Sequence, residues 1–162
     1  MSKGISPFIA YALVILLAVS AVSLVLILGL PVIQRSRESI TFDIALNNMQ
    51  QLDSTIREVA SEGLGSLRAI QLSVTGGKYF VTNGTNKLVY AYETSQNLIA
   101  NATNTTRGNI RIEAGQKNGN LTLQYSKINI TGSFSVESGN YKICIENAGT
   151  SGGNTVINVR VC

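Results

Sequence analysis

The sequence of 162 residues predicts an α+β protein, in which a long N-terminal α-helix, first hydrophobic and then amphipathic, precedes a mainly antiparallel β-sandwich or barrel-like head domain. Three observations predict this fold class. No Asp, Glu, Lys, Arg or His occurs between Lys3 and Arg35. Apolar residues then recur at steps of mostly three and four as far as residue 60, as on one face of a helix. From residue 66 onward the hydrophobic period is two, and turn residues separate the runs, as expected of strands.

The apolar segment, residues 5–30, comes first. Its 26 residues span roughly 39 Å as an α-helix, enough to cross a hydrocarbon core of about 30 Å with some tilt. Pro7 falls in the first helical turn, where its missing N–H would lack a partner in any case. Pro31 lies in the helix interior and removes one backbone hydrogen bond, so we expect a kink or a short unwound stretch over residues 28–31.

The amphipathic extension, residues 32–62, continues the helix. Its apolar face comprises Ile40, Phe42, Ile44, Ala45, Met49, Leu52, Ile56, Val59 and Ala60, and its polar side comprises Asp43, Asn47, Gln50, Asp53, Arg57 and Glu58. Gly63 and Gly65 supply a stop signal. An unbroken helix over residues 5–62 would be roughly 87 Å long. The alternative is a membrane anchor followed by a separate short core helix.

The β-rich head is predicted over residues 66–162. Alternating runs indicate strands at residues 66–74, 78–82, 87–92, 109–114, 121–130, 133–136, 141–146 and 155–161. Asn83-Gly84 is the strongest hairpin signal in the chain. Residues 95–108 are polar and rich in Asn and Thr, which predicts a surface loop.

The two cysteines, Cys144 and Cys162, are predicted to form a disulfide across an antiparallel strand pair. With the cysteines facing each other, the same register places Glu146 opposite Arg160 and Ile145 opposite Val161, and puts Tyr141, Ile143 and Ile145 on one face with Ile157, Val159 and Val161. Two free thiols are the alternative, and metal binding would need further ligands. A disulfide favours an oxidising compartment or a hyperthermophilic host.

Five Asn-x-Ser/Thr triplets are candidate N-glycosylation sites, and all lie in the β-rich part: Asn83, Asn101, Asn104, Asn120 and Asn129. Asn101 and Asn104, in the predicted polar loop, are the best candidates for occupied sites, whereas Asn129 falls in a predicted strand. Together with the cysteines, these triplets support an extracellular head.

The apolar segment begins almost at the first residue, and this position bears on whether proteolytic processing would remove it. An ordinary secretory signal is cut after its apolar stretch, which is then discarded. Here the best small-residue junction, Gly4, precedes that stretch. A cut between Gly4 and Ile5 would remove four residues and retain the apolar helix as the N-terminus of the mature protein.

The junction Lys3-Gly4-Ile5-Ser6-Pro7, the retained apolar helix, the amphipathic extension and the β-rich head together resemble an archaeal type IV pilin. The first 35 or so residues carry the specific likeness, and the rest matches in architecture. The resemblance implies a class III signal peptide: a prepilin peptidase would remove residues 1–4, and the mature chain would begin at Ile5. It also implies a precursor in the cytoplasmic membrane, an assembly machinery, and a cell-surface filament built from identical subunits.

Two departures separate the chain from neighbouring families. Archaellins, the subunits of motility filaments, share this plan but usually carry a glycine-rich stretch soon after the cut, where this chain has Ser6-Pro7-Phe8. Bacterial pilins commonly place a glutamate at the fifth mature position, which is Ile9 here. The archaellin alternative stays open, and the bacterial assignment is weakened.

Patterns for catalysis are weak. The chain has no histidine, and its aspartates, Asp43 and Asp53, both fall on the predicted helix, so no Ser-His-Asp set and no metal-ligand spacing is recognisable. No phosphate-loop pattern occurs. The net charge of +4 is modest and basic residues form no run of three, which does not favour a nucleic-acid partner. We expect no enzyme activity, cofactor, metal or small-molecule substrate.

Two functional hypotheses remain. The first is a pilus subunit that polymerises through its N-terminal helix into an extracellular filament for adhesion or cell-cell contact. The second is a membrane-anchored binding protein of the archaeal envelope, whose helix stays in lipid while the head binds a solute or a surface-layer partner. The amphipathic extension discriminates between them, because a plain anchor needs no continuous helix there, whereas a filament needs a rod that carries the head away from its core.

Overall fold

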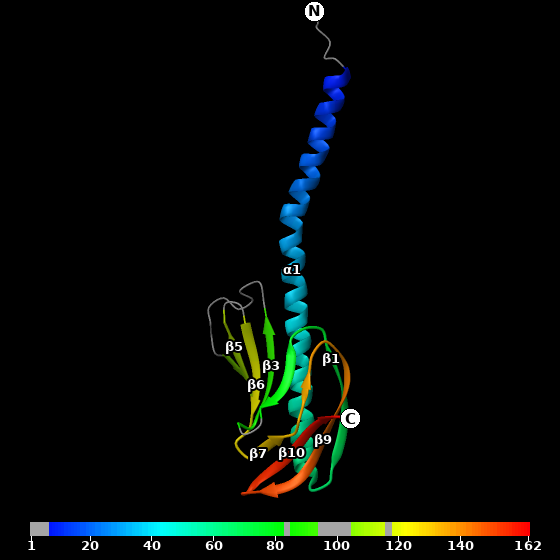
Figure 1. The fold of residues 1–162 in the computed structure, drawn as a ribbon. Coiled ribbons are helices and arrows are strands. Elements are labelled where there is room, and N and C mark those ends of the chain that lie inside the picture. Colours follow the sequence, from blue (N-terminus) through cyan, green and yellow to red (C-terminus); the bar gives the residue numbers. More distant parts are fainter. Residues whose placement is uncertain (1–6, 83–84, 94–104, 116–117) are drawn as a thin grey trace, which may run out of the picture. The chain divides into compact units, whose positions relative to one another are not determined.

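A computed structural model describes residues 7–82, 85–93, 105–115 and 118–162. The chain divides into two compact units, residues 1–37 and residues 38–162, and the second is called the head unit below. The predicted fold class is confirmed: one long helix is followed by two mostly antiparallel sheets (Figure 1). The pairing of β7 (Ile128–Thr131) with β10 (Asn154–Val161) is parallel.

Helix α1, Pro7–Glu62, is continuous through both units. The alternative of a separate short core helix is therefore wrong. Residues 28–31 are helical, so the predicted unwound stretch at Pro31 is also wrong: the backbone hydrogen bonds on either side of the proline maintain the helix. The kink at Pro31 stays a prediction. Gly63 and Gly65, with φ of 94° and 83°, follow the helix in the left-handed conformation that glycine adopts readily.

The six-stranded sheet has the strand order β4-β5-β6-β3-β2-β8. These strands are Thr105–Arg107, Ile110–Ala114, Asn118–Gln124, Lys87–Glu93, Lys78–Thr82 and Ser135–Val136. The predicted hairpin is present, since Thr82 pairs with Lys87, although its Asn83-Gly84 turn lies outside the described residues. The prediction of a loop over residues 95–108 is wrong at β4, which pairs with β5, and residues 95–104 lie outside the described part.

The four-stranded sheet has the strand order β1-β9-β10-β7. These strands are Leu67–Val74, Gly139–Ser151, Asn154–Val161 and Ile128–Thr131. A single strand over residues 121–130 was predicted, and this is wrong, because β6 and β7 belong to different sheets. Asn86 shows why the chain departs between them: its amide donates to the Ile128 carbonyl (2.8 Å), and its side-chain oxygen accepts from the Ile130 N–H.

The predicted cysteine register is wrong by two residues. Cys144 lies opposite Arg160, not Cys162, and Ile145 lies opposite Val159. Glu146 lies opposite Asn158. A shift of two residues keeps every side chain on the same face, so the alternation of the sequence cannot distinguish the two registers. The strands also shift register by one residue between Val156 and Ile157, where β9 carries an extra residue.

The two predicted side-chain contacts between β9 and β10 nevertheless form. They join residues that lie diagonally across the strand pair and not directly opposite each other. Cys144 and Cys162 are joined by a disulfide, with a Cα–Cα distance of 5.2 Å. The guanidinium of Arg160 lies 3.1 Å from the Glu146 carboxylate. The faces are as predicted for the buried Ile143, Ile145, Ile157 and Val159, whereas Tyr141 is half-buried and Val161 is exposed.

The core of the head unit lies between the two sheets and the second half of α1. The Tyr79 hydroxyl, from the six-stranded sheet, donates to the Ala45 carbonyl (3.4 Å), and the Asn147 amide, from the four-stranded sheet, donates to the Val59 carbonyl (3.1 Å). Fully buried side chains from all three elements meet here, among them Met49, Leu52, Ile56, Leu72, Leu88, Leu121 and Ile143. The head unit is thus a pair of sheets packed on a helix.

Candidate functional site

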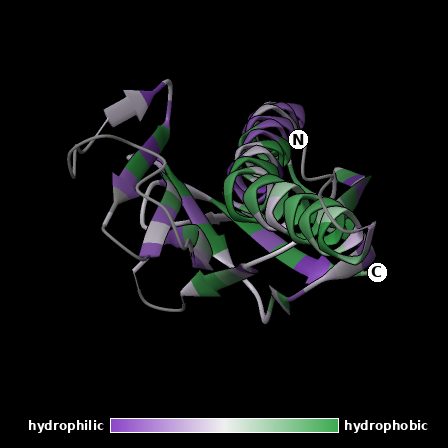
Figure 2. Ribbon diagram, turned by 90° about the horizontal axis from the view of Figure 1, so that it is seen from above, coloured by the Kyte–Doolittle hydropathy of each residue, from purple (hydrophilic) through white to green (hydrophobic). Residues whose placement is uncertain are grey.

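The first half of α1 exposes apolar side chains on every side. Each large apolar residue from Phe8 to Ile33 is more than half exposed, with exposed fractions from 51% at Ile33 to 81% at Phe8. Five consecutive residues, 13–17, are each at least 60% exposed, and consecutive helical positions are rotated by about 100°, so this exposure covers the whole circumference. Figure 2 shows these turns in the hydrophobic colour. In length and composition the segment suffices to cross a membrane.

The polar groups of this segment are satisfied within the helix. The Ser20 hydroxyl donates to the Leu17 carbonyl (2.9 Å), and the Ser23 hydroxyl donates to the Val19 carbonyl (2.8 Å). Neither serine therefore needs water or a partner chain for its hydrogen bond. The segment is compatible with surroundings that offer no hydrogen bonds, either lipid or other apolar helices. The predicted cleavage residues Gly4 and Ile5 lie outside the described residues.

The second half of α1 is amphipathic, as the spacing predicted. Ala45, Met49, Leu52, Ile56 and Val59 are buried, and the core also takes up Leu46 and Thr55. Ile40 was placed on the apolar face, but this prediction is wrong, since it is 55% exposed. Phe42, Ile44 and Ala60 are half-buried, and Asp53 departs from the predicted polar side because it too is half-buried.

Asp53 is the centre of a polar cluster that fixes the helix to the sheets. Its carboxylate accepts a charge-assisted hydrogen bond from Arg57 Nε (3.1 Å), and Arg57 Nη2 forms an ion pair with its other oxygen at 3.1 Å. The Tyr125 hydroxyl donates to the same carboxylate at 2.6 Å, and the Asn109 amide donates at 3.5 Å. The carboxylate is thereby compensated by donors from the helix and from the six-stranded sheet's end.

Burial and this hydrogen bond to Asp53 raise the pKa of Tyr125 above its usual value. The hydrogen bond and the charge of Asp53 also raise the pKa of Arg57. Tyr125 therefore stays protonated and acts as a donor. Sequence reasoning missed this role of Tyr125, because neither the period of the strand nor its polarity distinguishes a tyrosine that reaches the helix. The spacing of Asp53 and Arg57, four residues apart on a helix, was the available signal.

An aromatic row joins α1 to the six-stranded sheet. Ring centroids are 5.7 Å apart between Phe42 and Tyr92, 5.8 Å between Tyr92 and Tyr90, and 4.4 Å between Tyr90 and Tyr79. Burial raises the pKa of Tyr90 to about 12, and its hydroxyl donates to the Gly76 carbonyl (2.7 Å). Burial also raises the pKa of Tyr79. Both phenols therefore remain protonated at neutral pH and serve as structural donors.

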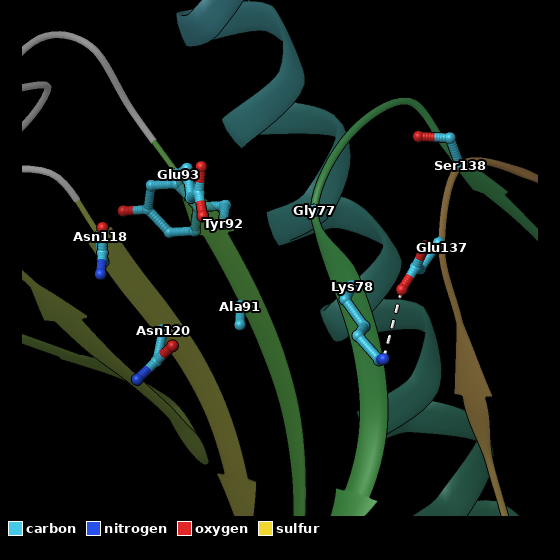
Figure 3. A pocket seen from close by; sticks show the side chains of 9 residues that line it. All are labelled: Gly77, Lys78, Ala91, Tyr92, Glu93, Asn118, Asn120, Glu137 and Ser138. Carbon is cyan, nitrogen blue, oxygen red and sulfur yellow. Dashed lines mark hydrogen bonds and ion pairs between the residues drawn. The ribbon is translucent and has the colours of Figure 1, made fainter.

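A polar hollow of about 560 Å³ lies at the end of the six-stranded sheet beside this row (Figure 3). Its lining includes Lys78, whose ammonium lies 3.2 Å from the Glu137 carboxylate, and Figure 3 shows this pair facing across the gap between β2 and the strand beside it. Glu93, Asn118 and Asn120 line the other side. The hollow therefore has two acids and one base, with amide groups between them.

The candidate glycosylation sites are dispersed. Asn83, Asn101 and Asn104 lie outside the described residues. Asn120 is half-buried in β6, where it lines the hollow of Figure 3. Asn129 lies in β7, as its strand prediction implies, and its side-chain oxygen accepts from the Asn154 amide at 3.5 Å. The structure brings none of the described triplets together.

The described part of the chain holds no group of three or more His, Cys, Asp or Glu residues that could bind a metal ion. Apart from the Asp53–Arg57 pair, the ion pairs of this part are surface contacts, such as that of Arg68 with Glu58 at 3.0 Å. Such exposed pairs contribute little to stability, typically about 0–1 kcal/mol.

Compared with known protein families, with curated proteins and with solved structures, the chain matches none of them.

Proposed function

We propose that the chain is a structural, non-enzymatic subunit of an archaeal type IV pilus, which polymerises through its N-terminal helix into an extracellular filament for adhesion or cell-cell contact. The observation that carries this proposal is the exposure of apolar side chains around the whole first half of α1. A helix that is apolar on all sides belongs in lipid or inside a bundle of like helices.

The energy of this surface argues that it is covered in the working protein. Burying one large apolar side chain is worth about 1.5–3 kcal/mol, so the side chains between Phe8 and Ile33 together represent tens of kcal/mol. A typical domain is stable by only about 5–15 kcal/mol. Identical helices are an available partner, and an interface that repeats by rotation and rise without closing gives a filament.

The second half of α1 supports a filament rather than a plain anchor. It continues the helix without a break from residue 30 to Glu62, and its inner face is part of the head unit's core. An anchor needs only a flexible connection, whereas a rod that ends in the core suits a head carried on the outside of a fibre. The disulfide fits a head that matures outside the cytoplasm.

The membrane-anchored binding protein is the second candidate. The hollow between Lys78 and Asn120 favours it, because ligand sites are concave and contain a few polar groups that fix the ligand's orientation. In that case the apolar segment would stay in lipid, and the head would act as a monomer.

Electron microscopy of sheared cell-surface material, combined with N-terminal sequencing of the subunit, separates the two candidates. The pilin proposal expects filaments whose subunits begin at Ile5. A variant with Gly4→Leu should remain an uncut precursor in the membrane and form no filaments. Subunits that retain Met1 and are found only in the membrane fraction would overturn the proposal, as would normal filaments from the Gly4→Leu variant.

A further inference from the structure

We propose that the head unit binds an acidic polysaccharide along a basic trough at one end of the six-stranded sheet. The trough is lined by Arg57, Lys87, Asn109, Arg111, Gln124 and Lys127. This proposal goes beyond the filament function and does not depend on it, because each trough residue belongs to the head unit.

The trough consists of two adjoining hollows. One has a volume of about 410 Å³ and includes Arg57 and Lys127 in its lining, and the other has a volume of about 290 Å³ and includes Lys87 and Arg111. Asn109 and Gln124 line both hollows, which places the two side by side. An elongated ligand can therefore contact both basic groups at once.

The strand register brings the second hollow together. Lys87 on β3 lies directly opposite Gln124 on β6, so these side chains share one face of the sheet. Arg111 on β5 lies opposite Thr122, two residues before Gln124 on the same strand, and residues two apart on a strand share a face. The basic groups of β3 and β5 thus flank β6, which supplies amide and hydroxyl groups between them.

The charges of the trough are unevenly compensated. Arg57 is paired with Asp53, and Arg111 is paired at 3.0 Å with Glu113, the one acid among the described residues that line the two hollows. Within the described ranges, neither Lys87 nor Lys127 forms an ion pair. Two lysines thus remain available to an anionic ligand, and the neighbouring arginines are held in place by their own acids.

The uncharged lining favours a polysaccharide over a nucleic acid. The amides of Asn109 and Gln124 and the hydroxyl of Ser126 can both donate and accept hydrogen bonds, as sugar hydroxyls require. Single-stranded nucleic acids instead bind to exposed aromatic rings. The aromatic residue in this lining is Tyr125, whose hydroxyl is already bound to Asp53. Duplex DNA has a dense row of phosphates and calls for more uncompensated cations than two.

The opposite end of the same β2–β3 pair supplies a matched control. Lys78 lies opposite Ala91 there, whereas Lys87 lies opposite Thr82 at the trough. Lys78 lines the hollow of Figure 3 and is paired with Glu137, and Glu93 adds a second acid. A polyanion should therefore avoid that end, and loss of the Lys78 charge should leave polyanion binding unchanged.

The experiment uses the full chain, solubilised in mild detergent as an unassembled subunit, so that its outcome is independent of filament formation. Binding of polygalacturonate, neutral dextran and a duplex DNA oligomer is measured at low salt by biolayer interferometry. We expect binding of polygalacturonate, none of dextran, and weaker binding of DNA. The double variant Lys87→Gln/Lys127→Gln should bind polygalacturonate roughly tenfold more weakly, since it loses two charge contacts.

Two further variants keep the result interpretable. Lys87→Arg/Lys127→Arg retains both charges and should bind as the wild type does, and Lys78→Gln should also bind normally. Thermal melting curves establish that each variant is folded. Wild-type-like binding by the double glutamine variant, an equal loss in Lys78→Gln, an absence of polygalacturonate binding by the wild type, or tighter binding of DNA than of polygalacturonate would each overturn the proposal. A negative result here leaves the filament proposal standing, because filaments are observed separately.

Discussion

The two halves of α1 form one continuous helix but lie in opposite environments. From Phe8 to Ile33 each large apolar side chain is more than half exposed, whereas Met49, Leu52, Ile56 and Val59 in the second half are completely buried. The second half has a polar side, and its apolar side is buried by the sheets of its own chain. The first half is apolar all round, so it requires a cover that is as apolar as itself. The difference teaches that one continuous helix can bury an apolar face in its own domain along one half and leave apolar side chains exposed all round along the other.

The largest expected effect is the loss of filament assembly when a charge is introduced into the first half of α1. In Val14→Asp we expect filament assembly to be abolished, because a dry bundle of helices offers the carboxylate no partner. Gln50→Lys introduces a charge on the exposed side of the second half and should assemble normally. Filaments are counted by electron microscopy, and membrane fractionation verifies that the variant subunit is still inserted. Normal filaments from Val14→Asp would contradict the proposed role of the first half.

Two matched side-chain truncations, one in each half of α1, should differ in their effect on the stability of the head unit. Leu52→Ala removes a completely buried side chain and should destabilise the head unit by about 2–5 kcal/mol, through lost burial and the cavity left behind. Leu16→Ala removes the same atoms from a position that is 72% exposed and should leave the melting of the head unit unchanged. Urea unfolding of the full chain in detergent measures both. Equal destabilisation by the two variants would mean that the first half also folds onto the head.

The contrast between the two halves could largely be predicted from the sequence. Spacings of three and four residues predicted the buried face correctly at Ala45, Met49, Leu52, Ile56 and Val59, because a helix imposes its period on any residue that packs against a core. Ile40 was misplaced, because nine helical positions of about 100° each put it on the opposite side of the helix from the buried Met49.

The long-range contacts of the head unit could be predicted less well from the sequence. The disulfide partners could be named, but the register of β9 and β10 could not, because registers that differ by two residues put the same side chains on the same face. The break between β6 and β7 depends on Asn86, which lies more than 40 residues away in sequence. The Asp53–Tyr125 contact and the basic trough depend in the same way on which distant segments fold together, and a local pattern carries no such information.

The disulfide offers a third comparison, because it belongs to the head unit alone. Serine at both Cys144 and Cys162 should lower the stability of the head by about 3 kcal/mol, chiefly because the unfolded chain gains freedom. Filament formation at moderate temperature should continue, since the first half of α1 is unaffected. Calorimetry of the oxidised wild type and the double serine variant measures the difference. An unchanged melting temperature would show that the bond is absent from the protein in solution.

The smallest expected effect concerns Tyr125, which fixes the second half of α1 through Asp53. Tyr125→Phe removes the 2.6 Å hydrogen bond to a carboxylate and should lower the stability of the head unit by about 1.5 kcal/mol at neutral pH.

The raised pKa of Tyr125 makes its contribution to stability depend on pH. In the unfolded chain the phenol ionises near pH 10, while the folded protein still holds its proton. The unfolded state therefore binds fewer protons above that pH, and stability is lost as the pH rises. Urea unfolding between pH 8 and about 11 should show a steeper fall for the wild type than for Tyr125→Phe, because the variant lacks the phenol whose pKa is raised by folding. Parallel curves would mean that Tyr125 ionises equally in both states, and that the helix is held without it.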